Sequence, residues 1–119
     1  MLTLALPTRV LLYVPPTDMR RGFDTLAALV RDHLGHDPLG GSLFVFRSRR
    51  GDRLKLLWWD DDGYALFYKR LEEGAFRFPA VGAGQAGVEI RSADLALILE
   101  GIDLDSVRRS KRYRRPAPA

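Results

Sequence analysis

Three consecutive carboxylates, Asp60, Asp61 and Asp62, are of a type that could bind a divalent metal for phosphoryl chemistry. Neighbouring side chains of an extended chain point to opposite sides, however, and no acidic residue follows at the spacing of a calcium-binding loop. The run ends in Asp-Gly, which is among the strongest short signals for a β-hairpin. We therefore interpret it as a solvated turn, with a small Asp-dependent nuclease as the remote alternative.

Two histidines, His33 and His36, have the i, i+3 spacing that can place two metal ligands on one helical face. Gly35 is expected to end the helix between them, and no third ligand is evident. Two ligands are too few for a zinc site, so both are interpreted as surface residues. The sequence predicts no metal, no cofactor and no catalytic residue.

Basic residues are dense in a second turn, which holds Arg49, Arg50 and Arg53, and they recur further along the chain at Lys69 and Arg70. A two-stranded ribbon tipped with arginines can contact a phosphate backbone or a DNA groove. The alternative is an ordinary solvated turn, in which Asp52 offsets its basic neighbours. The candidate binding residues of this group are Arg47, Arg49, Arg50, Arg53, Lys55, Lys69 and Arg70.

The C-terminal residues carry the positive charge of the protein. Residues 106–119 hold six basic and no acidic side chains, so the other 105 residues hold 13 basic and 15 acidic ones, a balance of −2. Such a tail could bind a polyanion, with affinity that falls steeply with salt, or could serve only to solubilise the chain. The candidate residues of the tail are Arg108, Arg109, Lys111, Arg112, Arg114 and Arg115.

Aromatic residues are interleaved with these arginines. Such residues can stack on unpaired bases, although most are expected in the core. Trp58 and Trp59 are adjacent on one expected strand, so they must point to opposite faces. One indole is expected in the core, and the other, if uncovered, would be an interface anchor. Which one is buried is left open, and Trp59 is taken as the candidate contact.

The bulk composition excludes several classes. Cysteine is absent, which excludes disulfides, cysteine-ligated zinc and thiol catalysis and fits the cytoplasm. The apolar N-terminal segment lacks a basic leader and is broken by prolines, so no signal peptide is expected. No apolar run reaches the roughly 18 residues that would span a bilayer.

Hydrophobic periodicity and turn signals predict the elements that hold these residues. Strands are expected over residues 9–14, 42–48, 54–59, 64–71 and 75–78, with a further short strand over 88–91. An apolar stripe that begins at Phe23 predicts a helix over 23–34, started by Thr17, Asp18 or Asp24 and ended by Gly35. A shorter helix is expected over 93–100, with Ser92 as its N-cap.

Together these elements predict an α+β fold. An antiparallel meander of four to five strands packs against the main helix, and a second short helix lies near the C-terminus. We expect a single domain over residues 1–105 and a disordered basic tail over 106–119, because the tail has charge but little to bury.

The sequence resembles the transposon accessory protein TnpB of the insertion sequence 66 family. The resemblance runs from about residue 9 to residue 103 and rests on TDMRRGFDTLAALV, on LFVFRSRRGDRLKLLWWDDDGYALFYKRLEEGAF and on LILEGIDL. The FRSRRGDRLKLLWWDDDG block followed by FYKRLEEG is its most specific part. The residues 80–87 and the basic tail are less characteristic.

The resemblance implies a protein encoded beside a transposase and needed for efficient movement of the element, without strand-cleaving chemistry of its own. The implied partner is the cognate transposase, with DNA of the element ends as a second one. The rival interpretation is an adaptor that binds only the transposase. An unrelated RNA-guided nuclease shares the TnpB label, but this chain is far too short for it. The oligomeric state is left open.

Overall fold

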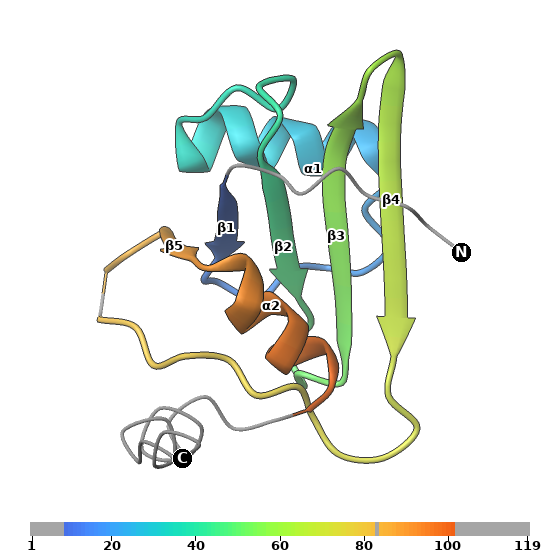
Figure 1. Cartoon of the computed structure of the whole chain (residues 1–119), viewed down its shortest axis with the longest axis vertical. Helices are drawn as coiled ribbons and strands as arrows, with labels where there is room; N and C mark the ends of the chain where they lie inside the picture. The colour runs from blue at the N-terminus through green and yellow to red at the C-terminus, as the bar shows by residue number, and fades with distance from the viewer. Residues whose placement is uncertain (1–8, 83, 102–119) are drawn as a thin grey trace, which may run out of the picture.

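The computed structural model describes residues 9–82 and 84–101 and has five strands and two helices (Figure 1). This arrangement confirms the predicted α+β class. In chain order the elements are β1 (Val10–Tyr13), α1 (Phe23–Leu29), the π-helical turn η1 (Val30–Leu34), β2 (Leu43–Arg47), β3 (Arg53–Asp60), β4 (Gly63–Arg70), β5 (Gly87–Ile90) and α2 (Ser92–Leu99).

The five strands form one mixed sheet in the order β4-β3-β2-β1-β5. Strands β2, β3 and β4 form an antiparallel meander of three strands, where four to five were predicted. Strand β1 pairs in parallel with β2, with Val10 opposite Leu43, and β5 is antiparallel to β1. The parallel pair follows from the long connection through α1 and η1, because a crossover of this length can return the chain beside β1 in the same direction.

One predicted strand is absent. Residues 75–78 are irregular: the Phe76 N–H donates to the Gly51 carbonyl at 2.8 Å, and the Leu71 N–H donates to the Asp52 carbonyl at 2.8 Å. A left-handed turn at Gly74 (φ 76°) directs this segment across the β2–β3 turn instead of along β4. Strand β4 is therefore the last strand of the sheet on that side.

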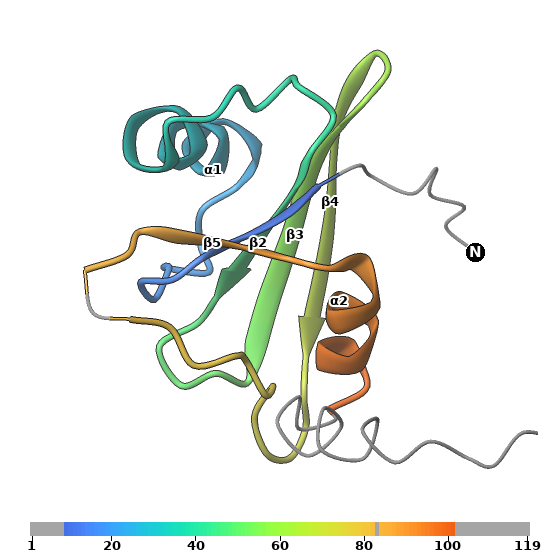
Figure 2. The same ribbon diagram turned by 60° about the vertical axis from the view of Figure 1, so that its left-hand side comes forward.

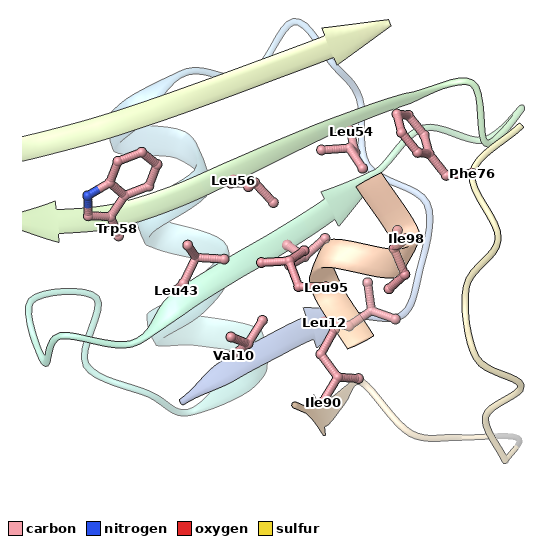
Figure 3. Close-up of a cluster of buried hydrophobic side chains, with 11 residues drawn as sticks. Val10, Leu12, Leu43, Leu54, Leu56, Trp58, Phe76, Ile90, Leu95 and Ile98 are labelled. Atoms are coloured by element: carbon pink, nitrogen blue, oxygen red, sulfur yellow. The ribbon is translucent and has the colours of Figure 1, made fainter. Parts of the chain in front are cut away.

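Both faces of the sheet are covered, α1 on one and α2 on the other (Figure 2). Leu54, Leu56 and Trp58 of β3 lie on the α2 side of the sheet and belong to one buried cluster with Leu95 and Ile98, in which Trp58 lies at the end away from α2 (Figure 3). Trp58 is 7% exposed, so it is the buried indole. The alternate residues of β3 face α1, and there Trp59 is half-buried, with its ring edge-to-face against Tyr64 at 5.1 Å.

The main helix begins later than its earliest predicted start. Gly22 is the N-cap, and its N–H donates to Thr25 Oγ1 at 3.1 Å. Phe23, expected in the apolar stripe, is 47% exposed, whereas Leu26 and Val30 are buried against the sheet. Gly35 ends η1 with φ 68°, as its sequence position predicted.

The second helix starts one residue earlier than predicted. Arg91 is the N-cap in place of Ser92, and its guanidinium pairs with the Asp94 carboxylate at 3.0 Å. No helix among residues 9–82 and 84–101 is long and apolar enough to cross a membrane.

Candidate nucleic-acid interface

The turn between β2 and β3 is closed by its own polar groups. Ser48 Oγ donates to Asp52 Oδ1 at 3.2 Å and accepts from the Arg53 N–H at 3.1 Å. The Gly51 N–H donates to the Ser48 carbonyl at 3.0 Å, and Gly51 takes the left-handed conformation with φ 77°. Because these contacts fix the backbone, the arginines at the tip of the turn are displayed on an ordered scaffold.

The arginines of this turn keep their charge available. Arg49 and Arg50 are exposed, and neither forms an ion pair or side-chain hydrogen bond with another residue of the described ranges. Arg53 is half-buried, and its Nη1 donates to the Tyr68 hydroxyl at 3.2 Å, again without an ion pair to a described residue. Internal ion pairing of these three residues would have removed the predicted cationic surface.

Two predicted contact residues hold the scaffold together instead. Lys55 is 6% exposed, its Nζ donates to the Arg21 carbonyl at 2.7 Å, and it lies 4.6 Å from the Tyr68 ring centroid. Arg47 Nε donates to the Val14 carbonyl at 2.8 Å, with the guanidinium 5.5 Å from the Phe78 ring centroid. Both side chains bind segments that lie far away in the sequence, so we assign them to the scaffold and not to the candidate binding residues.

The two basic residues of β4 point to opposite faces. Lys69 faces α2, and its Nζ donates to the Leu99 carbonyl at 3.2 Å, where a cation favourably meets the C-terminal end of the helix. Arg70 lies opposite Arg53 on the α1 face and pairs with Glu72 at 3.0 Å. Arg70 therefore stays with the arginines of the β2–β3 turn, whereas Lys69 supports α2.

A groove lies where three segments meet at this end of the sheet. It encloses about 510 Å³ between residues 17–20, the β2–β3 turn and β4. A second hollow of about 380 Å³ shares Arg53 and Tyr68 with it and extends to Arg70 and Glu72. We call the two together the arginine groove. The charged and aromatic residues that line it are Asp18, Arg20, Arg49, Arg50, Asp52, Arg53, Tyr68, Arg70 and Glu72.

One ion pair forms part of the rim of the arginine groove. Arg20 Nη2 lies 2.7 Å from Asp18 Oδ2, and the Arg20 N–H also donates to Asp18 Oδ1 at 2.9 Å. The hydrogen bonds from Arg20 lower the pKa of Asp18 from 3.8 to about 2. Asp18 thus offsets the charge of Arg20, and Glu72 offsets that of Arg70, so that Arg49, Arg50 and Arg53 are the cations lining the groove that have no ion pair with a described residue.

Tyr68 is the exposed aromatic residue of the arginine groove, with 47% of its surface accessible. Neither Tyr68 nor Arg20 was among the candidate binding residues predicted from the sequence. The alternation of β4 could have identified Tyr68, since it shares a face with Arg70 two residues on. The contribution of Arg20 depends on a contact between segments about thirty residues apart, for which the sequence carries no local signal.

The acidic turn lies at the other end of the same hairpin. Asp60 pairs with Gly63, seven residues along β3 from the Arg53–Arg70 pair, which is roughly 23 Å at the usual rise of a strand. Trp59 lies beside the acidic turn and not in the arginine groove. Among the described residues, no three His, Cys, Asp or Glu side chains come together in an arrangement that could hold a metal ion.

The histidine pair is separated as expected. His33 is exposed and its ring centroid is 6.4 Å from that of Tyr13, whereas the His36 ring is 6.3 Å from Phe44, on the other side of Gly35. The six basic residues predicted in the tail, Arg108, Arg109, Lys111, Arg112, Arg114 and Arg115, lie outside the described residues.

The fold and the charge distribution define a small α+β protein with a cationic groove at one end of its sheet. A family model described as IS66 Orf2-like protein, in the TnpB group of insertion sequence 66, matches residues 8–109. The chain belongs to this family, which confirms the resemblance seen in its motifs. Membership associates the chain with transposition in an accessory role.

Two relatives from Sinorhizobium fredii are similar over most of their length. Uncharacterized protein y4hO is 45% identical over 95 residues, which cover 80% of this chain and 81% of that protein. Uncharacterized protein y4jC is 40% identical over 108 residues, which cover 91% of this chain and 90% of that protein. No solved structure matches the chain.

Proposed function

We propose that this protein is a non-enzymatic accessory factor for transposition of an insertion sequence, and that its arginine groove binds DNA. The observation that carries this proposal is the display of Arg49, Arg50 and Arg53 on a closed turn without acidic partners among the described residues. Planar guanidinium groups match phosphate oxygens in geometry as well as charge. The expected place of action is the cytoplasm, beside the cognate transposase.

The folded body and the tail have separate tasks in this proposal. The body carries a balance of −2, so its attraction to DNA has to come from the local charge of the arginine groove. The six basic residues of 106–119 add affinity that does not depend on sequence. Three arginines that replace counterions would contribute about −2.7 to the slope of log K against log salt.

A titration of DNA fragments from the element ends tests the proposal. Arg50→Ala should weaken binding and make the salt slope shallower by about one unit, because one phosphate contact is lost. Arg31→Ala is the matched control, since Arg31 is also exposed, lacks an ion pair with the described residues and lies on η1 outside the groove. Absence of binding at low salt, with and without transposase, would refute the proposal.

An adaptor that binds only the transposase is the second candidate. The net negative body, the acidic turn and the half-buried Trp59 beside it favour a protein partner at the end of the hairpin opposite the groove. Co-purification with the cognate transposase distinguishes the two candidates. If Trp59→Ala abolishes capture while removal of residues 106–119 abolishes all affinity for DNA, the folded body is an adaptor.

The nuclease alternative requires the acidic turn. Asp60, Asp61 and Asp62 are exposed at the tip of the β3–β4 hairpin, and Asp61 takes a φ of 61°, a conformation that Asp tolerates in turns. In our proposal these carboxylates perform no chemistry. Asp61→Ala and Asp62→Ala should therefore leave transposition frequency unchanged, and a large loss with either substitution would restore the nuclease interpretation.

A further inference from the structure

The geometry points to unpaired DNA as the ligand of the arginine groove, with one base stacked on the ring of Tyr68. This inference rests on the proposed function and specifies the form of DNA that the groove takes. It starts from an aromatic side chain that has contacts on the protein side and is still 47% exposed.

The Tyr68 ring is held from the protein side. The ammonium of Lys55, which is itself buried, lies 4.6 Å from the ring centroid, and the Arg53 guanidinium donates to the Tyr68 hydroxyl at 3.2 Å. Lys55 is in turn fixed by the Arg21 carbonyl at 2.7 Å. These contacts restrict the ring to one orientation, so little conformational freedom is lost when a ligand stacks on it.

The same residue is accessible at the edge of the sheet. Tyr68 lies on β4, and β4 is the last strand of the sheet, so no described strand covers it from that side. Lys55 lies over the ring from the side of β3, and 47% of the residue is still exposed. A flat, supported aromatic surface that faces outward is the feature with which proteins bind successive bases of a single strand.

Arginines of β3 and β4 lie next to the Tyr68 ring on the same face of the sheet. Arg70 is two residues from Tyr68 on the same face, and Arg53 is the cross-strand partner of Arg70. The groove then continues to the exposed Arg49 and Arg50 at the tip of the turn. A single strand of DNA could thus place one base on the Tyr68 ring and its flanking phosphates on guanidinium groups. This combination of stacking and cationic contacts is typical of single-strand binding.

A duplex uses only part of this site. Paired bases remain stacked on one another inside the helix, so the faces that Tyr68 could contact are not available until a base is unstacked. A duplex can still place phosphates against Arg49 and Arg50 at the outer end of the groove. The inference therefore predicts that the aromatic ring contributes to the binding of single strands and adds nothing to the binding of duplex DNA.

The test uses the full-length chain in which the six basic residues of 106–119 are replaced by glutamine, so that the tail does not mask the groove. Binding is measured by fluorescence anisotropy with a labelled oligothymidine of about 12 nucleotides and with a duplex of the same length. Tyr68→Leu removes the ring, and Tyr68→Phe is the matched control that keeps it. Circular dichroism checks that each variant is folded.

We expect Tyr68→Leu to weaken binding of the single strand by about 5- to 150-fold, the value of one base stacked on an aromatic ring. Tyr68→Phe should stay within about twofold of the parent, and binding of the duplex should be unchanged by either substitution. An unchanged affinity of Tyr68→Leu for the single strand, or an equal loss for both forms of DNA, would overturn the inference.

A second variant covers the case in which Tyr68→Leu does not fold. Tyr68→Trp keeps a flat ring at the same position, and its added fluorescence should be quenched by the oligothymidine and not by the duplex. Absence of that difference would also overturn the inference. Two outcomes separate the inference from the proposed function. If the protein binds single-stranded and duplex DNA equally well and Arg50→Ala weakens both, DNA binding by the groove stands and only the stacking is refuted. If neither form of DNA binds at low salt, the proposed function itself is refuted.

Discussion

The buried Lys55 gives the sharpest prediction about the scaffold. Its Nζ donates to the Arg21 carbonyl at 2.7 Å and lies 4.6 Å from the Tyr68 ring centroid, with 6% of the residue exposed. A hydrogen bond from a charged group contributes about 1.5–3 kcal/mol, and a cation–π contact about 0.5–2 kcal/mol. The cost of removing the ammonium from water offsets part of this sum.

We therefore expect Lys55→Met, which keeps the apolar part of the side chain and removes the ammonium, to lower the free energy of unfolding by about 2 kcal/mol. Lys55→Ala also removes three buried methylene groups at about 0.8 kcal/mol each, so its loss should reach about 4 kcal/mol. The assay is urea unfolding followed by tryptophan fluorescence, with the slope m checked for constancy.

The control for Lys55→Met is Arg50→Met. Arg50 is exposed and has no polar contact with the described residues, so its replacement should change the free energy of unfolding by less than about 0.5 kcal/mol. A value for Lys55→Met within that same range would refute our assignment of Lys55 as a structural residue. It would mean that the ammonium gains no more from its partners than it loses by leaving water.

Three further predictions concern the two indoles, the helix end and one titrating group. Trp58→Ala should lower the free energy of unfolding by about 3–5 kcal/mol because Trp58 is 7% exposed, whereas Trp59→Ala should lower it by about 1–2 kcal/mol because Trp59 is half-buried. Urea unfolding measures both, and equal losses would contradict the difference in burial. Gly35→Ala should cost about 1 kcal/mol through its φ of 68°, and an unchanged melting temperature would count against that strain. Because the pKa of Asp18 is lowered to about 2 from 3.8, its pair with Arg20 stabilises the fold above pH 3.8 and is lost as the pH falls through about 2. Carbon NMR of the Asp18 carboxyl checks this, and Arg20→Ala should return the titration toward 3.8.

Local signals predicted the elements but not all of their neighbours. The alternation in β3 and the Asp-Gly turn after it define the β3–β4 hairpin, and Gly35 defines the end of the main helix. The parallel pairing of β1 with β2 was not predicted, because nothing within β1 specifies which strand lies beside it after a long crossover. The expected strand over 75–78 is absent because the left-handed turn at Gly74 leads that segment across the β2–β3 turn instead of along β4.

In the candidate site, too, the sequence identified the residues marked by a local turn but not the contacts between residues far apart in the chain. The sequence located the exposed arginines of the β2–β3 turn, because Gly51 and its polar neighbours mark a turn. It also assigned Lys55, Arg47 and Lys69 to the contact set, although each is bound to a carbonyl about 30 residues away. A lysine or arginine with a distant internal partner looks the same in sequence as one that is free in solvent.

NMR mapping of the bound DNA tests the central claim most directly. The isotope-labelled full-length chain is titrated with single-stranded DNA, and amide shifts are compared between the two ends of the β3–β4 hairpin. Our account predicts the largest changes at residues 17–20, 48–53 and 68–72, and none at the acidic turn of residues 60–63. Changes confined to residues 106–119 would contradict it, because DNA would then bind the tail and leave the arginine groove empty.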